Sequence, residues 1–202
     1  MIQTRIGTLA DAEFARRYAE PLFRLRYRVF YERLHWDVRC QDEKETDEYD
    51  DPQTVYVVAV DDEDRVAGGW RLRPTVGNYM LEDVFPQLLH GTPAPHDPRI
   101  WESNRFVVDK RSTKDSRFGF NETARALFRA TAQYGVEQGI DEYIMVLSAG
   151  VVRLTRGSGL IVHQYGPPVR IGEVLSVGCR IRIDEHTRHV LLGEPLPLDR
   201  AA

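Results

Sequence analysis

Two apolar runs separated by a short acidic turn constrain this chain more than any other feature. Residues 55–60 read VYVVAV and residues 66–75 read VAGGWRLRPT, with DDED between them. Runs that are rich in β-branched and aromatic residues and bounded by a polar turn predict a β-hairpin. The chain is therefore expected to build an antiparallel sheet, and its remaining segments have to cover that sheet.

The pattern around this hairpin predicts one domain over residues 1–202. An alternating strand at 1–7 precedes it, together with a helix from the Thr8-x-x-Asp11 start to Tyr18 and a second helix over 22–34 that Pro21 opens. After it we expect a helical or turn-rich piece at 79–89, strands at 99–109, 141–149, 160–166 and 173–184, and helices at 121–139 and 151–159. This order predicts an α/β (α+β) three-layer sandwich, with a mixed, mostly antiparallel sheet and helices on both faces.

Composition excludes several classes of function. A net charge of −4 gives no general reason to expect nucleic-acid binding. No apolar run is long enough to span a bilayer, and the N-terminus lacks a secretion leader, so we expect a cytoplasmic protein. The lone thiols Cys40 and Cys179 fit a reducing compartment. No phosphate-binding glycine loop and no metal-binding pattern is present.

The predicted helix at 22–34 presents a candidate binding face. Arg26 and Phe30 lie four residues apart and share one side of the helix, and Trp36 follows just beyond. An arginine beside aromatic rings can hold a ligand that carries both a carboxylate and an apolar or cationic group. The alternative is an amphipathic helix whose arginines extend into solvent.

Residues 37–54 are acidic and without period, and a segment of this length is functional or disordered. The part ETDEYDD, which contains Asp47 and Asp50, can attract a cationic substrate or can be a solvated loop. Arg71 and Arg73 share one side of the following strand. If that side is buried, each arginine needs a carboxylate, and the candidates are Asp47, Asp50 and Glu102. If it is exposed, they need none.

The stretch IWESNRF, residues 100–106, sets a geometric condition. Strict alternation places Glu102 and Asn104 on one face of the strand, and Ser103 and Arg105 on the other. Glu102 and Arg105 can therefore serve one site only if the strand is bulged, twisted or ended there. An exposed ion pair on an edge strand carries no such condition.

Five segments, LRYRVFYERLHWDV, ETDEYDD, GGWRLRPT, YMLEDVFPQLL and WESNRFVVD, stand in the order and spacing of the acyl-homoserine-lactone synthases. The chain resembles this family of LuxI-type autoinducer synthases. The resemblance implies a fold like that of the GNAT N-acetyltransferases. It also implies a reaction in which the amine of S-adenosylmethionine is acylated from a thioester and the product closes to a lactone. Methylthioadenosine then leaves, so S-adenosylmethionine is a consumed substrate and no cofactor is expected.

The resemblance assigns roles to particular positions. It implies a catalytic group of Glu102, Asp47, Asp50 and Arg71, with Glu102 as general base and Asp47 as the alternative. It implies that the S-adenosylmethionine site consists of Arg26, Phe30, Trp36, Arg105 and Phe106. The acyl pocket is expected at Asn104, Met145, Leu147 and Val151.

Two positions depart from the family pattern. Serine is usual where this chain has Asn104, so substrate positioning there is expected to differ. Members that make 3-oxo signals tend to carry threonine where this chain has Met145. Because methionine offers no hydroxyl, we expect an acyl group without a 3-oxo substituent.

The carrier of the acyl group stays open between acyl carrier protein and coenzyme A. A basic patch can bind either one, and its residues are Lys110, Arg111, Lys114, Arg117, Arg153 and Arg156. Two other functions also stay open, an N-acyltransferase of the GNAT type that acts on another amine and a non-catalytic ligand-binding module. The sequence does not decide the oligomeric state.

Overall fold

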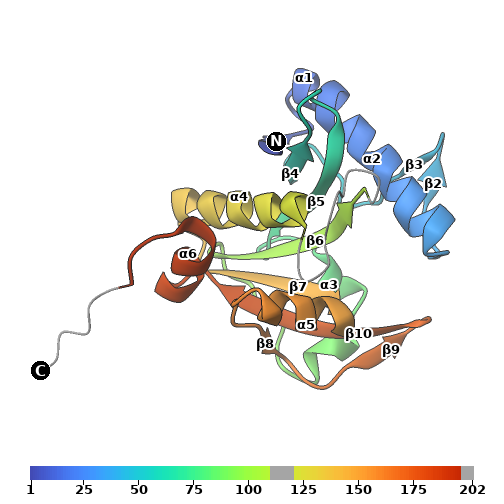
Figure 1. Ribbon diagram of the computed structural model, residues 1–202. Helices are drawn as coiled ribbons and strands as arrows, with labels where there is room; N and C mark the ends of the chain where they lie inside the picture. Colours follow the sequence, from blue (N-terminus) through green and yellow to red (C-terminus); the bar gives the residue numbers. More distant parts are fainter. Residues whose placement is uncertain (110–120, 197–202) are drawn as a thin grey trace, which may run out of the picture.

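The computed structural model describes residues 1–109 and 121–196 and contains one large mixed sheet (Figure 1). Its strands run in the order β1-β4-β5-β6-β7-β10-β8, and β9 pairs with β10. The predicted hairpin is confirmed as β4 and β5, with Val57 opposite Trp70. Among the strands of the described residues, the pairing of β6 with β7 alone is parallel. The strand bounds are β1 Gln3–Thr8, β4 Val55–Val60, β5 Val66–Pro74, β6 Ile100–Val108, β7 Glu142–Ser148, β8 His163–Gln164, β9 Val169–Ile171 and β10 Val174–Arg182.

Helices cover both faces of the sheet, as predicted (Figure 1). One face packs its buried residues, among them Trp70, Met145 and Leu147, against α4 (Glu122–Gln138), α5 (Ala149–Gly157) and α6 (Glu185–Leu192). The other face packs against the N-terminal helical segment, and further along against α3 (Met80–Asp83) and the short helix η3 (Pro86–Leu89). The sheet is therefore the middle of three layers.

The N-terminal helical segment does not break at Pro21, so the prediction of two separate helices there is wrong. Helix α1 (Ala12–Phe14), η1 (Ala15–Ala19), α2 (Glu20–Arg26) and η2 (Tyr27–Arg33) follow one another without a gap. Asp11, and not Thr8, caps the start by accepting hydrogen bonds from two backbone N–H groups. Segment η1 is π-helical, and its wider turn directly before Pro21 gives room to the proline ring.

Three other elements differ from expectation. Helix α6 was not predicted, and the strand expected at 160–166 shortens to β8. The acidic segment, expected to be aperiodic, contains a small hairpin of β2 (Cys40–Gln41) and β3 (Lys44–Glu45). Within the described part of the chain, no helix is long and apolar enough to cross a membrane.

Strand β6 contains the irregularity that a shared site for Glu102 and Arg105 requires. Gly69 pairs with Val107 and Arg71 pairs with Asn104, so the single residue Trp70 faces two residues of β6. This is a β-bulge, and at its centre Arg105 has a φ of 55°, in the left-handed region. The bulge brings Arg105 to the same face as Glu102. Beside it, β6 pairs with β7 only from Ile100 to Glu102.

Candidate functional site

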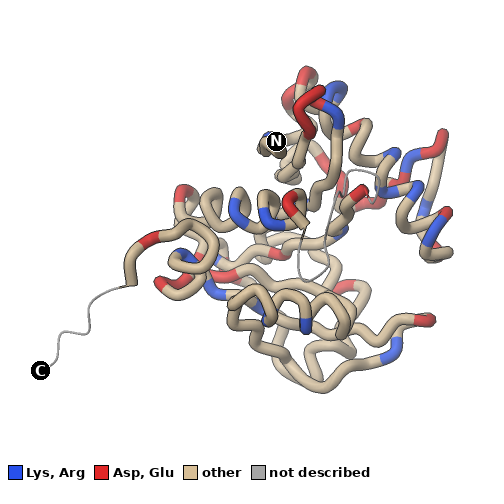
Figure 2. The backbone as a smooth tube through the Cα atoms, viewed as in Figure 1, with Lys and Arg blue, Asp and Glu red and all other residues tan. Residues whose placement is uncertain are grey.

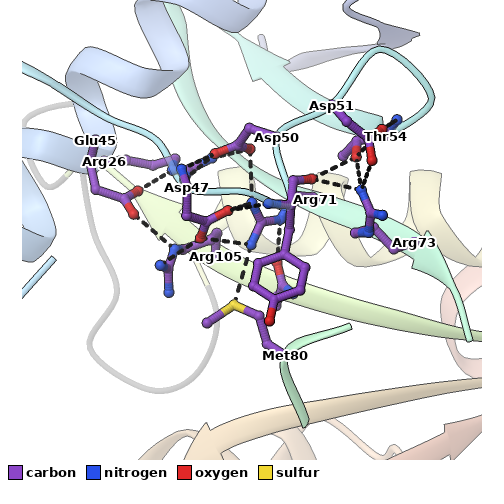
Figure 3. Close-up of polar contacts among 12 residues, drawn as sticks. Arg26, Glu45, Asp47, Asp50, Asp51, Thr54, Arg71, Arg73, Met80 and Arg105 are labelled. Atoms are coloured by element: carbon purple, nitrogen blue, oxygen red, sulfur yellow. Dashed lines mark hydrogen bonds and ion pairs between the residues drawn. The ribbon is translucent and has the colours of Figure 1, made fainter. Parts of the chain in front are cut away.

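Three arginines and three carboxylates form a closed ring of ion pairs at the sheet face that carries α2 (Figure 3). We call this group the charge ring. Each arginine in it contacts two carboxylates, and each carboxylate contacts two arginines. In order around the ring, the members are Arg26, Glu45, Arg105, Asp47, Arg71 and Asp50.

The contacts of the charge ring are short and partly bidentate. Arg26 binds both oxygens of Asp50 at 2.9 Å and also pairs with Glu45. Arg105 donates from Nε to Glu45 at 3.0 Å and from Nη2 to Asp47 at 2.7 Å. Arg71 pairs with Asp47 and lies 2.9 Å from Asp50. Paired guanidinium forks of this kind fix carboxylates in direction as well as in distance.

Four separate segments supply the charge ring, and local contacts hold the acidic one in shape. Arg26 ends α2, Arg71 lies on β5 and Arg105 on β6, whereas the carboxylates come from residues 45–50. The backbone N–H of Asp47 donates to Asp50 at 2.9 Å, and the Tyr56 hydroxyl donates to Asp50 at 2.8 Å. The acidic segment is thus an ordered part of the site. Figure 2 shows both signs of charge interspersed on this side of the molecule, around α2, β2 and β3.

Burial makes these pairings electrostatically strong. Burial by itself would raise the pKa of Asp50, but Arg26 and Arg71 outweigh it and hold that pKa well below its usual range. The pKa of Asp47 is lowered as well, because Arg71 and Arg105 overcome the same burial effect. The pKa of Arg105 is lowered by its own burial. At neutral pH the carboxylates of Asp47 and Asp50 are therefore anions with fixed partners.

Glu102 lies beside the charge ring and is held by hydrogen bonds. Its side chain is fully buried, and its oxygens accept from the backbone N–H groups of Met80 at 3.0 Å and Leu81 at 2.7 Å. Asn104 Nδ2 adds a third bond at 2.5 Å. Burial raises the pKa of Glu102, and these bonds act against that rise. Glu102 was a candidate partner of Arg71, but Arg71 pairs with Asp47 and Asp50 and reaches Glu102 only through Asn104.

The aromatic residues predicted for the site are divided between the two faces of the sheet. Phe30 and Trp36 stack with ring centres 4.9 Å apart and planes 3° from parallel, and the Arg105 guanidinium lies 5.9 Å from the Phe30 ring centre. Trp36 is 36% exposed, so it can accept a ligand. Phe106 instead packs against Trp70 and Phe128 on the opposite face. The bulge explains this, since it turns Arg105 toward the charge ring and leaves Phe106 pointing toward α4.

The predicted acyl-pocket residues are also divided. Met145 lines a cavity of about 20 Å³ between the sheet, α4 and α6, and Leu147 and Val151 belong to the same apolar cluster. Asn104 lies on the other face, against Glu102 and Arg71. Ser103 also lines the cavity, and its buried hydroxyl has no hydrogen-bond partner among the described residues.

Sequence reasoning missed two parts of this arrangement. Glu45 was noticed only as one acid of a cluster, yet it joins Arg26 to Arg105 in the charge ring. Arg73 pairs with Asp51, which was not among its candidate partners. Both pairings could have been sought from the fact that a buried arginine needs a carboxylate partner. Alternation along a strand, however, does not indicate which carboxylate of a dense acidic cluster lies next to a given arginine.

The predicted basic patch can be placed only in part. Lys110, Arg111, Lys114 and Arg117 lie outside the described residues. Arg153 is exposed on α5, and Arg156 donates to the carbonyl oxygen of Val162 at 2.8 Å.

Known proteins are similar to this chain in sequence and in overall structure. The family model for autoinducer synthases matches residues 11–191. An acyl-homoserine-lactone synthase of Pseudomonas aeruginosa is 36% identical over 192 residues, which is 94% of each chain. One from Aliivibrio fischeri is 39% identical over 171 residues, covering 84% of this chain and 88% of the relative.

Solved structures agree with these relatives. The crystal structure of the acyl-homoserine-lactone synthase LasI superposes with a TM-score of 0.85 at 35% identity, covering 99% of both chains. A coenzyme A-dependent synthase, BjaI, solved with methylthioadenosine, gives 0.84 at 28% identity over 96% of this chain and 91% of BjaI. A putative N-acetyltransferase from Lactobacillus plantarum, at 15% identity and a TM-score of 0.61, shares the fold. The chain therefore belongs to the autoinducer synthase family, and its enzyme class is that of the acyltransferases.

Proposed function

We propose that this enzyme is an acyl-homoserine-lactone synthase that acylates S-adenosylmethionine and releases methylthioadenosine. The charge ring is the observation that carries the proposal. Its three arginines and three carboxylates cancel formally, and the neighbouring Glu102 adds one negative charge to a buried site. S-adenosylmethionine carries a sulfonium, an ammonium and a carboxylate, so its net charge of one positive unit complements this excess. BjaI has been solved with S-adenosylmethionine and isopentyl-coenzyme A, which supports the same substrate classes here.

Among the arginines, Arg105 is the best placed to bind the carboxylate of the methionine part. Its side chain is 12% exposed, whereas Arg26 is 1% exposed and uses all three of its nitrogens within the charge ring. The exposed face of Trp36 offers a stacking surface for the adenine, because aromatic rings stack in offset parallel arrangements. Asp47, Asp50 and Arg71 hold the acidic segment and Arg105 in place.

The reaction then needs two bond exchanges. Glu102 accepts a proton from the substrate ammonium, directly or through a water molecule, and the free amine attacks the thioester carbonyl carbon. The carbon–sulfur bond of the thioester breaks, the nitrogen loses its second proton as the amide forms, and the leaving thiolate takes up that proton. The methionine carboxylate next attacks the carbon that bears the sulfonium. That carbon–sulfur bond breaks with its electron pair on sulfur, so neutral methylthioadenosine leaves and the lactone remains.

The side chains on the cavity side of the sheet support a proposal about the acyl group. Met145 is 2% exposed and presents only apolar surface there, so we propose an acyl group without a 3-oxo substituent. Turnover of matched 3-oxo and unsubstituted thioesters tests this, and preference for the 3-oxo substrate contradicts it. The carrier is acyl carrier protein or coenzyme A, and the same acyl group presented on each identifies it. The free thiols of Cys40 and Cys179 fit the reducing cytoplasm that we propose for this enzyme.

The decisive experiment is mass spectrometry of the purified protein incubated with S-adenosylmethionine and a panel of acyl thioesters. We expect acyl-homoserine lactone and methylthioadenosine in equal amounts, and loss of both with Glu102→Gln. Glu82→Gln is the matched control, because Glu82 lies on α3 and pairs with the surface residue His96. Thiol release without methylthioadenosine would instead indicate simple N-acylation, and an active Glu102→Gln protein would remove Glu102 as the base.

A further inference from the structure

Asn104 forms the contact that joins Glu102 to the charge ring. Its Nδ2 donates to Glu102 at 2.5 Å, and its Oδ1 accepts from Arg71 Nε at 2.8 Å. Only this orientation of the amide suits both neighbours, because a carboxylate can only accept and a guanidinium can only donate. Asn104 therefore has one fixed arrangement between two buried charged groups.

Hydrogen bonds, and not ion pairs, stabilise the ionised form of Glu102 among the described residues. Among the described residues, no arginine or lysine forms an ion pair with it, although the side chain is fully buried. Two of its three hydrogen bonds come from the backbone at the start of α3, and no substitution at Met80 or Leu81 except proline would remove them. The third comes from Asn104, which among the described residues is the one side chain that donates to Glu102.

We propose that Asn104 is a positioning residue that keeps Glu102 ionised and oriented for proton transfer and couples it to Arg71. This inference rests on the proposed function, in which Glu102 accepts the proton of the substrate amine. The amide spans the distance between the carboxylate and the guanidinium because its oxygen and its nitrogen point in different directions. A serine hydroxyl can also donate and accept, but its oxygen lies one atom nearer the main chain, so without movement of the backbone it reaches these two partners less closely than the amide does.

The test compares Asn104→Ala, Asn104→Ser and Asn104→Asp with the wild-type enzyme over a range of pH. Loss of a donor to a buried carboxylate destabilises the anion, so the pKa of Glu102 rises. We expect the acid limb of kcat/KM to move up by about one pH unit in Asn104→Ala, and by less in Asn104→Ser. The added anion in Asn104→Asp moves it further. The KM for S-adenosylmethionine changes less than kcat, because Arg71 keeps its contacts to Asp47 and Asp50.

A second measurement does not depend on turnover. The ¹³C signal of the labelled Glu102 carboxyl group reports its pKa directly, and we expect a higher value in Asn104→Ala than in the wild type. Asn78→Ala is the matched control, since Asn78 is an exposed asparagine shortly before α3. An unchanged Glu102 pKa in Asn104→Ala, or a loss of rate that is equal at every pH, overturns the proposal. A wild-type protein that forms no lactone overturns the proposed function, while the NMR titration still decides the role of Asn104.

Discussion

Ser103 and Thr131 are both buried beside the small cavity under α4, and they differ in what their hydroxyl groups contact. Thr131 Oγ1 accepts a hydrogen bond from the Trp70 indole at 2.7 Å, whereas Ser103 Oγ has no partner among the described residues. A buried polar group costs free energy when it is unpaired, and removal of one partner of a buried pair leaves the other in that condition.

We therefore predict opposite outcomes for two substitutions of similar size. Thr131→Val leaves the Trp70 N–H unpaired and should lower the free energy of unfolding by about 1–3 kcal/mol. Ser103→Ala removes an unpaired hydroxyl, so the free energy of unfolding should stay equal or rise. Urea unfolding of the two variants measures both values. A larger loss for Ser103→Ala than for Thr131→Val would contradict the contacts described for these hydroxyls.

At the residue scale, the sequence predicted the carboxylate partners of Arg71 but not the remaining ion pairs of the charge ring. Arg71 was expected near Asp47 and Asp50 because a buried arginine needs carboxylates, and it pairs with both. The part of Glu45 was not foreseen, since it depends on the β2–β3 hairpin, which no periodic pattern indicated. The resemblance assigned Phe106 to the same site as Arg105, but successive residues of a strand face opposite sides, and the bulge gives the ring side to Arg105 and the α4 side to Phe106.

At the scale of elements, the bulge in β6 is the feature on which the site depends. An irregularity in this strand could be deduced as a condition of the site, because Glu102 and Arg105 cannot share a face of a regular strand. Its form was not deducible, since a twist or a strand end would have met the same condition. The structure resolves this as an arginine at a φ of 55°, a conformation that costs about 1–2 kcal/mol for a residue with a Cβ atom.

This strain predicts a difference between Arg105→Gly and Arg105→Ala. Both variants lose the ion pairs with Glu45 and Asp47, so both should be less stable than the wild type and inactive. Glycine adopts the left-handed conformation freely, and alanine does not. Arg105→Gly should therefore be the more stable of the two by about 1 kcal/mol in urea unfolding. Equal stability would show that the backbone leaves this conformation when the ion pairs are lost.

At the scale of the whole molecule, the order of elements was predictable and their limits were less so. The hairpin and the helices on both faces follow from apolar periodicity. Helix α6 was missed because only Ile183 separates the end of strand β10 from the N-cap Asp184, so the apolar pattern of the strand continues into that of the helix. The N-terminal helices were wrongly divided at Pro21, because a π-helical turn accommodates the proline and leaves no mark in the periodic pattern.

The charge ring also gives the molecule a particular response to acid. Asp47 and Asp50 have pKa values lowered in the folded state, so their contribution to stability is complete above the unfolded pKa of about 4. It is lost as the pH falls through their folded-state pKa values. The contribution of Glu102 to stability depends on pH in the opposite direction, since its raised pKa favours the protonated form in the folded state.

Against the effect of burial, the pKa values of Asp51 and Asp61 are lowered as well, by their arginine partners and by hydrogen bonds. More carboxyl groups thus act in the direction of Asp47 and Asp50 than in that of Glu102. We therefore expect the free energy of unfolding to fall below about pH 4. Urea unfolding at a series of pH values from 7 to 3 measures this. Asp50→Asn should be less stable at pH 7 and show a shallower loss toward pH 3, because one titrating group is removed. A wild-type stability that does not change between pH 5 and pH 3 would contradict the described pairing.

The bulge reverses the relation between residue number and sheet face along β6. Before it, the even-numbered residues Glu102 and Asn104 face the charge ring, and after it the odd-numbered Val107 faces that side and Val108 the other. Without Arg105, the remaining residues would alternate regularly and each would keep its present face. Arg105 therefore corresponds to the insertion of a single residue, encoded by one codon, into a regular strand. An insertion of that size adds a positive charge that pairs with Glu45 and Asp47 to the middle of a packed sheet, while every neighbouring side chain keeps its place.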